Sequence, residues 1–191
     1  MTIIRIARVL GLCMLLLSGG TVMAAGNGSE KERAEIRKAS TAVLSKLYKV
    51  QPSARKAIES AAGYATFSNF GMKILVAGSG SGKGVAVKKG ESPKEVFMKM
   101  IEVQAGLGFG IKKFNLVFVF QNASAFDRFV NSGWEGSTQA TAAASDGNKG
   151  ASYAGAVSLG SGVWLYQLTD KGVAAEVTVK GTKYYKDDAL N

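Results

Sequence analysis

Residues 78–87 read GSGSGKGVAV, and glycine occupies every second position up to Gly84. Residues two apart in an extended chain point to the same face, so this pattern predicts a strand with one face stripped of side chains. The spacing returns in QAGLGFGIKK at 104–113. Such a face marks a bend, a bulge or the close approach of another segment. Close packing or barrel curvature is the favoured interpretation, and a ligand groove is the alternative.

The lysine in this run raises the question of a phosphate-binding loop. A P-loop needs four residues between its glycines and a hydroxyl side chain after its lysine. Here three residues separate Gly78 from Gly82, and Lys83 is followed by Gly84. A dinucleotide fingerprint fails as well, because its last glycine would fall on Val85. The spacing therefore argues against nucleotide binding.

Two segments upstream have helical character. SEKERAEIRKASTAVLSKLY, at 29–48, is expected to begin at Ser29 as its N-cap. Pro52 is expected to begin a shorter helix that runs to Ala62 and stops at Gly63. The first helix is amphipathic, because its apolar residues lie three and four apart at Ile36, Ala39, Val43 and Leu47.

Most of the remaining chain is predicted to be strands. NASAFDRFVNSGW, at 122–134, interrupts them as a short helix capped by Asn122 or Ser124, and LTDKGV at 168–173 predicts a hairpin. Short spacings without crossover helices favour antiparallel pairing. The expected class is α+β, with N-terminal helices packed on a mostly antiparallel, glycine-rich β-sheet or barrel and one further short helix. The strand segments are GYATF, GMKILVAGSG, GKGVAVKK, KEVFMKMIEVQAGLGFGIKK, FNLVFVFQ, GASYAGAVSLG, SGVWLYQLTD and GVAAEVTVKG.

The first 24 residues have the composition of a secretory signal peptide. Arg5 and Arg8 precede an apolar run at 9–17, and Val22 and Ala24 have the small or apolar character expected before a cut after Ala24. A lipoprotein signal would need a cysteine where the sequence has glycine after LSG. We therefore expect a periplasmic protein that is exported by a cleavable signal and is not a lipoprotein.

Removal of residues 1–24 changes what the chain offers chemically. It removes the single cysteine, so no disulfide is expected. The whole chain has 24 basic residues, and loss of Arg5 and Arg8 leaves 22. Against 14 acidic residues, the net charge of the remaining chain is +8. Such an excess favours anionic partners.

The side chains of the commonest catalytic and metal sites are missing. The chain has no histidine, so Ser–His and Cys–His nucleophilic systems are excluded and zinc loses its usual ligands. Ser81 and Lys83, two apart on one strand, do not indicate a catalytic pair. Asp187 and Asp188 are interpreted as a solvated chain end rather than a cation site. We predict a protein that is not an enzyme and that has no metal site and no cofactor.

Five segments in order carry a family resemblance: AAGYATF at 61–67, VAGSGSGKGVAV at 76–87, VQAGLGFG at 103–110, FVFQNASAFDRF at 118–129 and LTDKGVAAEVTVKGTKYYKDD at 168–188. Together they resemble the SYLF domain, a lipid-binding domain also called the actin-binding domain of its fungal members. The resemblance covers about residues 50–191. The chain departs from the family pattern at Ser68, at SPKEVFMKMIEV and at Lys186.

The resemblance implies a SYLF-like β-rich domain at 50–191, preceded at 25–49 by a basic amphipathic helix and linker. Eukaryotic members prefer phosphoinositides; for an exported bacterial chain, anionic phospholipid or the membrane surface is the expected partner, and neither actin nor nucleic acid is expected. Each cation near an anionic bilayer contributes about 1 kcal/mol. The lipid-binding residues expected here are Lys31, Arg33, Arg37, Lys38, Lys46, Lys49 and Lys83.

Two functions from different classes stay open. The first is a non-catalytic lipid-binding module, whose salt-dependent adsorption to anionic vesicles is lost when Arg37 and Lys38 become glutamate. Ile36, Val43 and Leu47 enter the bilayer interface only if the helix is not docked on the sheet. The second is a cell-envelope structural or interaction protein that binds a protein partner or itself, forms stable oligomers and is indifferent to vesicle charge.

Overall fold

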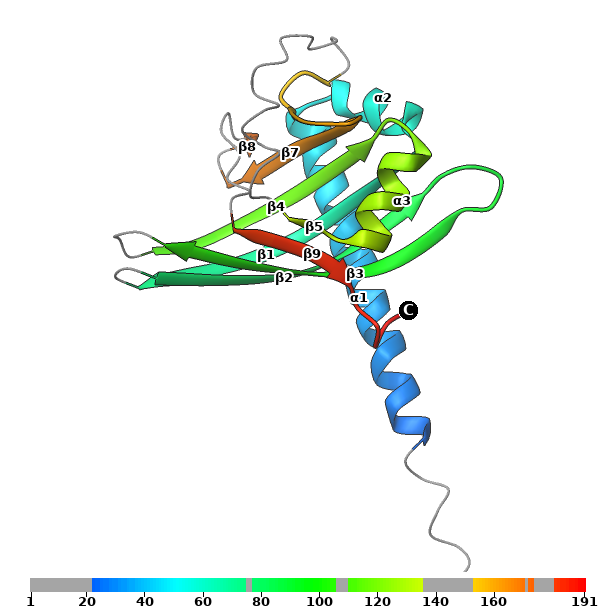
Figure 1. Cartoon of the computed structure of the whole chain (residues 1–191), viewed down its shortest axis with the longest axis vertical. Helices are drawn as coiled ribbons and strands as arrows, with labels where there is room; N and C mark the ends of the chain where they lie inside the picture. The colour runs from blue at the N-terminus through cyan, green and yellow to red at the C-terminus, as the bar shows by residue number, and fades with distance from the viewer. Residues whose placement is uncertain (1–21, 75–76, 106–109, 136–152, 171, 174–180) are drawn as a thin grey trace, which may run out of the picture.

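The computed structural model describes residues 22–74, 77–105, 110–135, 153–170, 172–173 and 181–191. Two helices lead into a long antiparallel hairpin and two further long strands, and a third helix precedes five shorter strands (Figure 1). The predicted α+β class is confirmed. In chain order the elements are α1 (Val22–Val50), α2 (Ser53–Ser60), β1 (Gly63–Ile74), β2 (Ala77–Lys88), β3 (Lys94–Ala105), β4 (Gly110–Phe120), α3 (Ala123–Ser132), β5 (Trp134–Glu135), β6 (Val157–Gly160), β7 (Val163–Thr169), β8 (Gly172–Val173) and β9 (Thr182–Lys186).

A single nine-stranded sheet organises the molecule. Its order is β5-β9-β3-β2-β1-β4-β7-β6, with β8 paired to β7, and every pairing is antiparallel. β1 lies at its centre and pairs with β2 on one side and β4 on the other. The hairpin predicted from LTDKGV is present, because Leu168 pairs with Val173 and Thr169 with Gly172. The antiparallel pairing is as the short spacings predicted, and half of the pairings join strands that follow one another in the chain.

One face of the sheet is covered by α1 and α2 (Figure 1). The apolar positions of the predicted helix lie in this interface, and Ile36, Val43 and Leu47 are 7%, 5% and 0% exposed. The buried hydroxyl of Thr66 on β1 donates to the Ser40 hydroxyl of α1 at 2.7 Å, so the polar groups in the contact are paired. The helix is therefore docked, which answers the question the sequence left open.

Three predicted helix boundaries are wrong. α1 begins at Val22, so Ser29 lies inside the helix and does not cap it. Met23, Ala24 and Ala25 favour helix, whereas Gly26, Asn27 and Gly28 do not, so local propensity alone does not explain the extension. α2 has Pro52 as its N-cap, but it ends at Ser60. Gly63 is not its stop, because it already pairs with Lys88 as the first residue of β1.

The opposite face of the sheet packs against α3 and carries most of the aromatic core. Asn122 caps α3, and its side chain accepts a hydrogen bond from the Ala125 backbone N–H at 2.8 Å, as predicted. Phe67, Phe118 and Tyr184 form edge-on contacts with ring centroids 4.8–5.9 Å apart. The sheet is therefore buried on both faces.

Gly84, one of the alternating glycines, allows close packing within the sheet. A Cβ built on Gly84 would lie 2.1 Å from the Thr66 carbonyl oxygen and 2.6 Å from the Phe67 ring. The Phe67 ring fills the space that a side chain at this position would need. The packing interpretation holds at Gly84. The glycines at 106 and 108, the alternation at 174–180 and the loop at 145–150 lie outside the described residues.

We predict that Gly84→Ala lowers the free energy of unfolding by at least about 2 kcal/mol, because backbone and a locked ring must move. Gly28→Ala is the matched control. Nothing lies within 4 Å of a Cβ built at Gly28, and the residue is helical, so this change should raise stability by about 0.5–1 kcal/mol. Urea denaturation measures both. Equal stabilities of the two variants would contradict the packing role.

Candidate functional site

Six of the seven cations predicted to bind lipid project from α1, and the seventh, Lys83, projects from β2. The structure divides them into two groups. Arg33, Arg37, Lys46 and Lys83 are in ion pairs. Lys31, Lys38 and Lys49 are exposed and make no ion pair with another residue in the described part of the chain.

The two arginines hold the N-terminal half of α1 on β3 and on the C-terminal segment. Arg37 donates from Nε to Glu95 at 2.8 Å and from Nη1 to Glu30 at 3.2 Å. Arg33 donates to the Leu190 carbonyl at 2.9 Å and to Glu30 at 3.1 Å. These bonds lower the pKa of Glu30, with Arg33 the larger cause, and the bond to Glu95 raises the pKa of Arg37. The guanidinium groups act first as docking groups.

Lys83 lies in a pair of like charges on the sheet. It is opposite Lys99 in the β2–β3 register, an arrangement that destabilises a sheet when the charges are bare. Glu32 of α1 binds Lys83, and Asp187 binds Lys99 at 2.8 Å. Each lysine is thus neutralised by a carboxylate from a different segment, and neither carboxylate was singled out from the sequence as part of this arrangement.

The C-terminal acidic pair differs from its predicted role. Asp187 is only 2% exposed, accepts from the Ala189 backbone N–H and pairs with Lys99, so the interpretation as a solvated chain end is wrong for this residue. Spacing along the chain gave no sign of the partner on β3. The preceding Tyr184 is fully buried in the aromatic core, and burial, followed by the charge of Glu102, raises its pKa well above the usual value.

The three exposed lysines of α1 form one line, which we call the lysine ridge (Lys31, Lys38 and Lys49). They are separated by 7 and 11 residues, so at 3.6 residues per turn their directions agree within about 20°. The ridge extends about 27 Å along the helix axis. Apolar residues on the other side of α1 face the sheet, so the ridge lies on the outward side of the helix, and Lys31 at its N-terminal end also borders a hollow beside the sheet.

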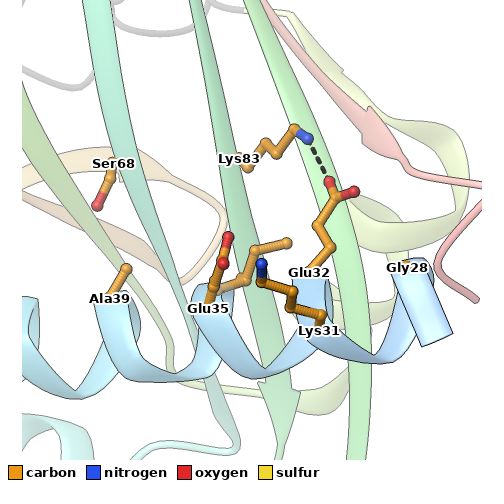
Figure 2. Close-up of a pocket in the computed structure, with 8 residues that line it drawn as sticks. Gly28, Lys31, Glu32, Glu35, Ala39, Ser68 and Lys83 are labelled. Atoms are coloured by element: carbon orange, nitrogen blue, oxygen red, sulfur yellow. Dashed lines mark hydrogen bonds and ion pairs between the residues drawn. The ribbon is translucent and has the colours of Figure 1, made fainter.

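A hollow beside the ridge lies between α1 and the first two strands; we call it the helix–sheet hollow. It has a volume of about 450 Å³. Figure 2 shows Lys83 and Glu32 joined by their ion pair, with side chains of α1 along the helix side and Ser68 on the neighbouring strand. Its lining residues are Gly28, Lys31, Glu32, Glu35, Ile36, Ala39, Ser68 and Lys83.

A second hollow of about 410 Å³ meets the first at Ser68. It includes Lys46, Lys113 and Asp170, and Lys46 lies 3.9 Å from Asp170. Ser81 lines this second hollow while Lys83 lines the first, so the two are not directed into one site. The arrangement offers paired charges and hydroxyls, which suit recognition of a charged ligand.

Two further observations concern the described residues. They contain no group of three or more His, Cys, Asp or Glu side chains placed to hold a metal ion. None of the helices formed by these residues combines the length and the apolar character that a bilayer crossing requires.

Comparison with known proteins finds a family match in the C-terminal part of the chain. Residues 101–191 match the family described as "Las17-binding protein actin regulator", Ysc84, whose domain is also called SYLF. A curated relative, "Beta cell expansion factor A" of Aeromonas veronii, is 29% identical over 162 residues. The match covers 85% of this chain but 60% of that protein, so the chain spans less than two thirds of its relative.

We predict that Lys83→Glu loosens the N-terminal half of α1, because it places two carboxylates together where Glu32 now pairs with Lys83. The exchange Glu32→Lys with Lys83→Glu should restore the pairing. Since exposed pairs contribute at most about 1 kcal/mol, the expected change is up to about fivefold in amide hydrogen exchange. Exchange measured at residues 30–40 by mass spectrometry tests this. No recovery in the exchanged variant would contradict the docking role.

Proposed function

We propose, from the match of residues 101–191 to the SYLF family, that the protein is an exported, non-catalytic lipid-binding protein. It associates with anionic phospholipid at a membrane surface through the basic face of α1. The observation that carries the proposal is the lysine ridge, a line of three exposed cations without ion-pair partners among the described residues.

The docked position of α1 supports adsorption to the surface over insertion. Ile36, Val43 and Leu47 are buried against the sheet. Their entry into a bilayer would expose residues of β2 and β3, which pack with Ile36, and residues of β4 and β7, which pack with Val43 and Leu47. The ridge needs no such change, because its ammonium groups already face outward. Lysines close to an anionic bilayer contribute about 1 kcal/mol each, a contribution that salt screens.

The contacts that dock α1 on the sheet reduce the number of cations that are available to bind lipid. Arg33 and Arg37 are engaged with Glu30, Glu95 and the Leu190 carbonyl, so their removal would disturb the fold as well as the charge. The variant with Arg37 and Lys38 changed to glutamate mixes both effects. The ridge lysines can be reversed without breaking a described ion pair.

The alternative function is that of an envelope protein whose partner binds to the glycine face of the strands. At Gly84 this alternative has less support. The Phe67 ring already occupies that position. Binding to a protein or to a second copy therefore stands as an outcome of the tests below.

We predict that Lys31→Glu, Lys38→Glu and Lys49→Glu together weaken co-sedimentation with vesicles containing phosphatidylglycerol by more than about tenfold, because three attractions become repulsions. High salt should weaken binding of the unchanged protein in the same assay. The matched control is Lys56→Glu, Lys94→Glu and Arg128→Glu, three exposed cations elsewhere with the same change in net charge.

The two triple variants separate a located surface from general charge. Strong loss in the ridge variant with little change in the control supports the proposal. Equal loss in both would make binding a property of net charge, and no binding of the unchanged protein to any vesicle would favour the protein-partner alternative.

Export is a separate part of the proposal. Arg5 and Arg8, the apolar run and the small residue at Ala24 support removal of residues 1–24. We predict that intact-mass analysis of a periplasmic extract finds a chain that begins at Ala25. A chain that keeps its first residues and stays with the cytoplasmic fraction would contradict export.

A further inference from the structure

The helix–sheet hollow presents charges of both signs to one space. Lys31 and Lys83 supply ammonium groups, and Glu32 and Glu35 supply carboxylates. Lys83 and Glu32 satisfy each other across the hollow, where their ion pair joins α1 to β2 (Figure 2). The remaining opposite charges, Lys31 and Glu35, are those available to a ligand.

Lys31 and Glu35 are four residues apart on α1, which places them as neighbours on one side of the helix. Both are exposed, and neither makes an ion pair with another described residue. Ser68 is exposed on β1 and also lines the hollow. Ile36, 7% exposed, and Ala39 give the hollow an apolar floor.

This set of groups discriminates between ligand charges. Lys31 would attract a simple anion but Glu35 would repel it. A simple cation would be attracted by Glu35 and repelled by Lys31. A compact zwitterion satisfies both, with its anionic end on the ammonium group and its own ammonium on the carboxylate. The ammonium must carry N–H groups, because a quaternary ammonium has no proton to donate to Glu35.

We propose that the helix–sheet hollow binds a phosphoethanolamine group, the headgroup of phosphatidylethanolamine. Its phosphate lies on Lys31, and its ammonium donates to Glu35. This inference rests on the proposed function, because Lys31 belongs both to the lysine ridge and to the hollow. A bilayer adsorbed on the ridge therefore meets the hollow with its headgroups. The hollow, about 450 Å³, is an open surface depression.

The test titrates the purified protein with soluble glycerophosphoethanolamine and follows backbone amide shifts by NMR. Saturable shifts at residues of α1 and β1 that line the hollow are expected. Glu35→Gln should weaken binding about fivefold, since it removes the charge that holds the ammonium. Glu91→Gln is the matched control, an exposed glutamate away from the hollow that loses the same charge. Glycerophosphocholine and glycerol phosphate should each bind more weakly by about the same factor.

Several results would overturn the inference: no saturable shifts, shifts confined to other residues, equal affinity of Glu35→Gln, or equal affinity for the three headgroups. Vesicles distinguish the two sources of the group. Preference for phosphatidylethanolamine over phosphatidylcholine in neutral vesicles would assign the site to lipid, and response to the soluble headgroup alone would overturn that assignment.

Failure here is distinguishable from failure of the proposed function. Glu35→Gln removes a negative charge next to the ridge, so it should leave adsorption to anionic vesicles intact or strengthen it. Glu35→Gln is thus expected to weaken binding of the soluble headgroup without weakening adsorption to anionic vesicles. Adsorption to anionic vesicles without headgroup binding would leave the ridge in place and remove only the hollow.

Discussion

The docking of α1 on the sheet is the contact on which the rest of the surface depends. Ile36, Val43 and Leu47 supply the apolar part, and Arg33 and Arg37 fix the N-terminal half through charged hydrogen bonds. Burial of such side chains contributes about 1.5–3 kcal/mol each, whereas exposed ion pairs contribute about 0–1 kcal/mol. The apolar residues therefore hold the helix, and the ion pairs set its register and orientation.

That orientation decides which cations face water. A helix with one side on a sheet presents the opposite side outward, and in α1 the outward side carries the lysine ridge. Arg33, Arg37 and Lys46, the other predicted cations on α1, pair with Glu30, Glu95 and Asp170. Of the cations predicted to bind lipid, the docked helix thus leaves three lysines without a described ion pair and engages the others in ion pairs.

The sequence predicted what depends on local patterns. The amphipathic helix, Pro52 at the start of α2, the Asn122 cap and the hairpin after Leu168 follow from spacing and turn chemistry. The order of segments indicated the family that residues 101–191 match. Pairings between distant segments were missed, as for Asp187. Charge spacing on one helix does not reveal the whole docking role of Arg33 and Arg37, because two of their partners, the Leu190 carbonyl and Glu95, come from elements far away in the chain.

The two-sided burial of the sheet explains why the glycine run lies beside the docked helix. β1 and β2 carry α1 on one face and the aromatic cluster with α3 on the other, so bulk must be removed where Phe67 crosses Gly84. The same strands place Ser68 and Lys83 next to α1, where the helix does not cover them fully. Tight packing on the inner face and an open edge on the helix face are therefore produced by one hairpin. The helix–sheet hollow lies on the face that carries α1, where Ser68 and Lys83 contribute polar side chains.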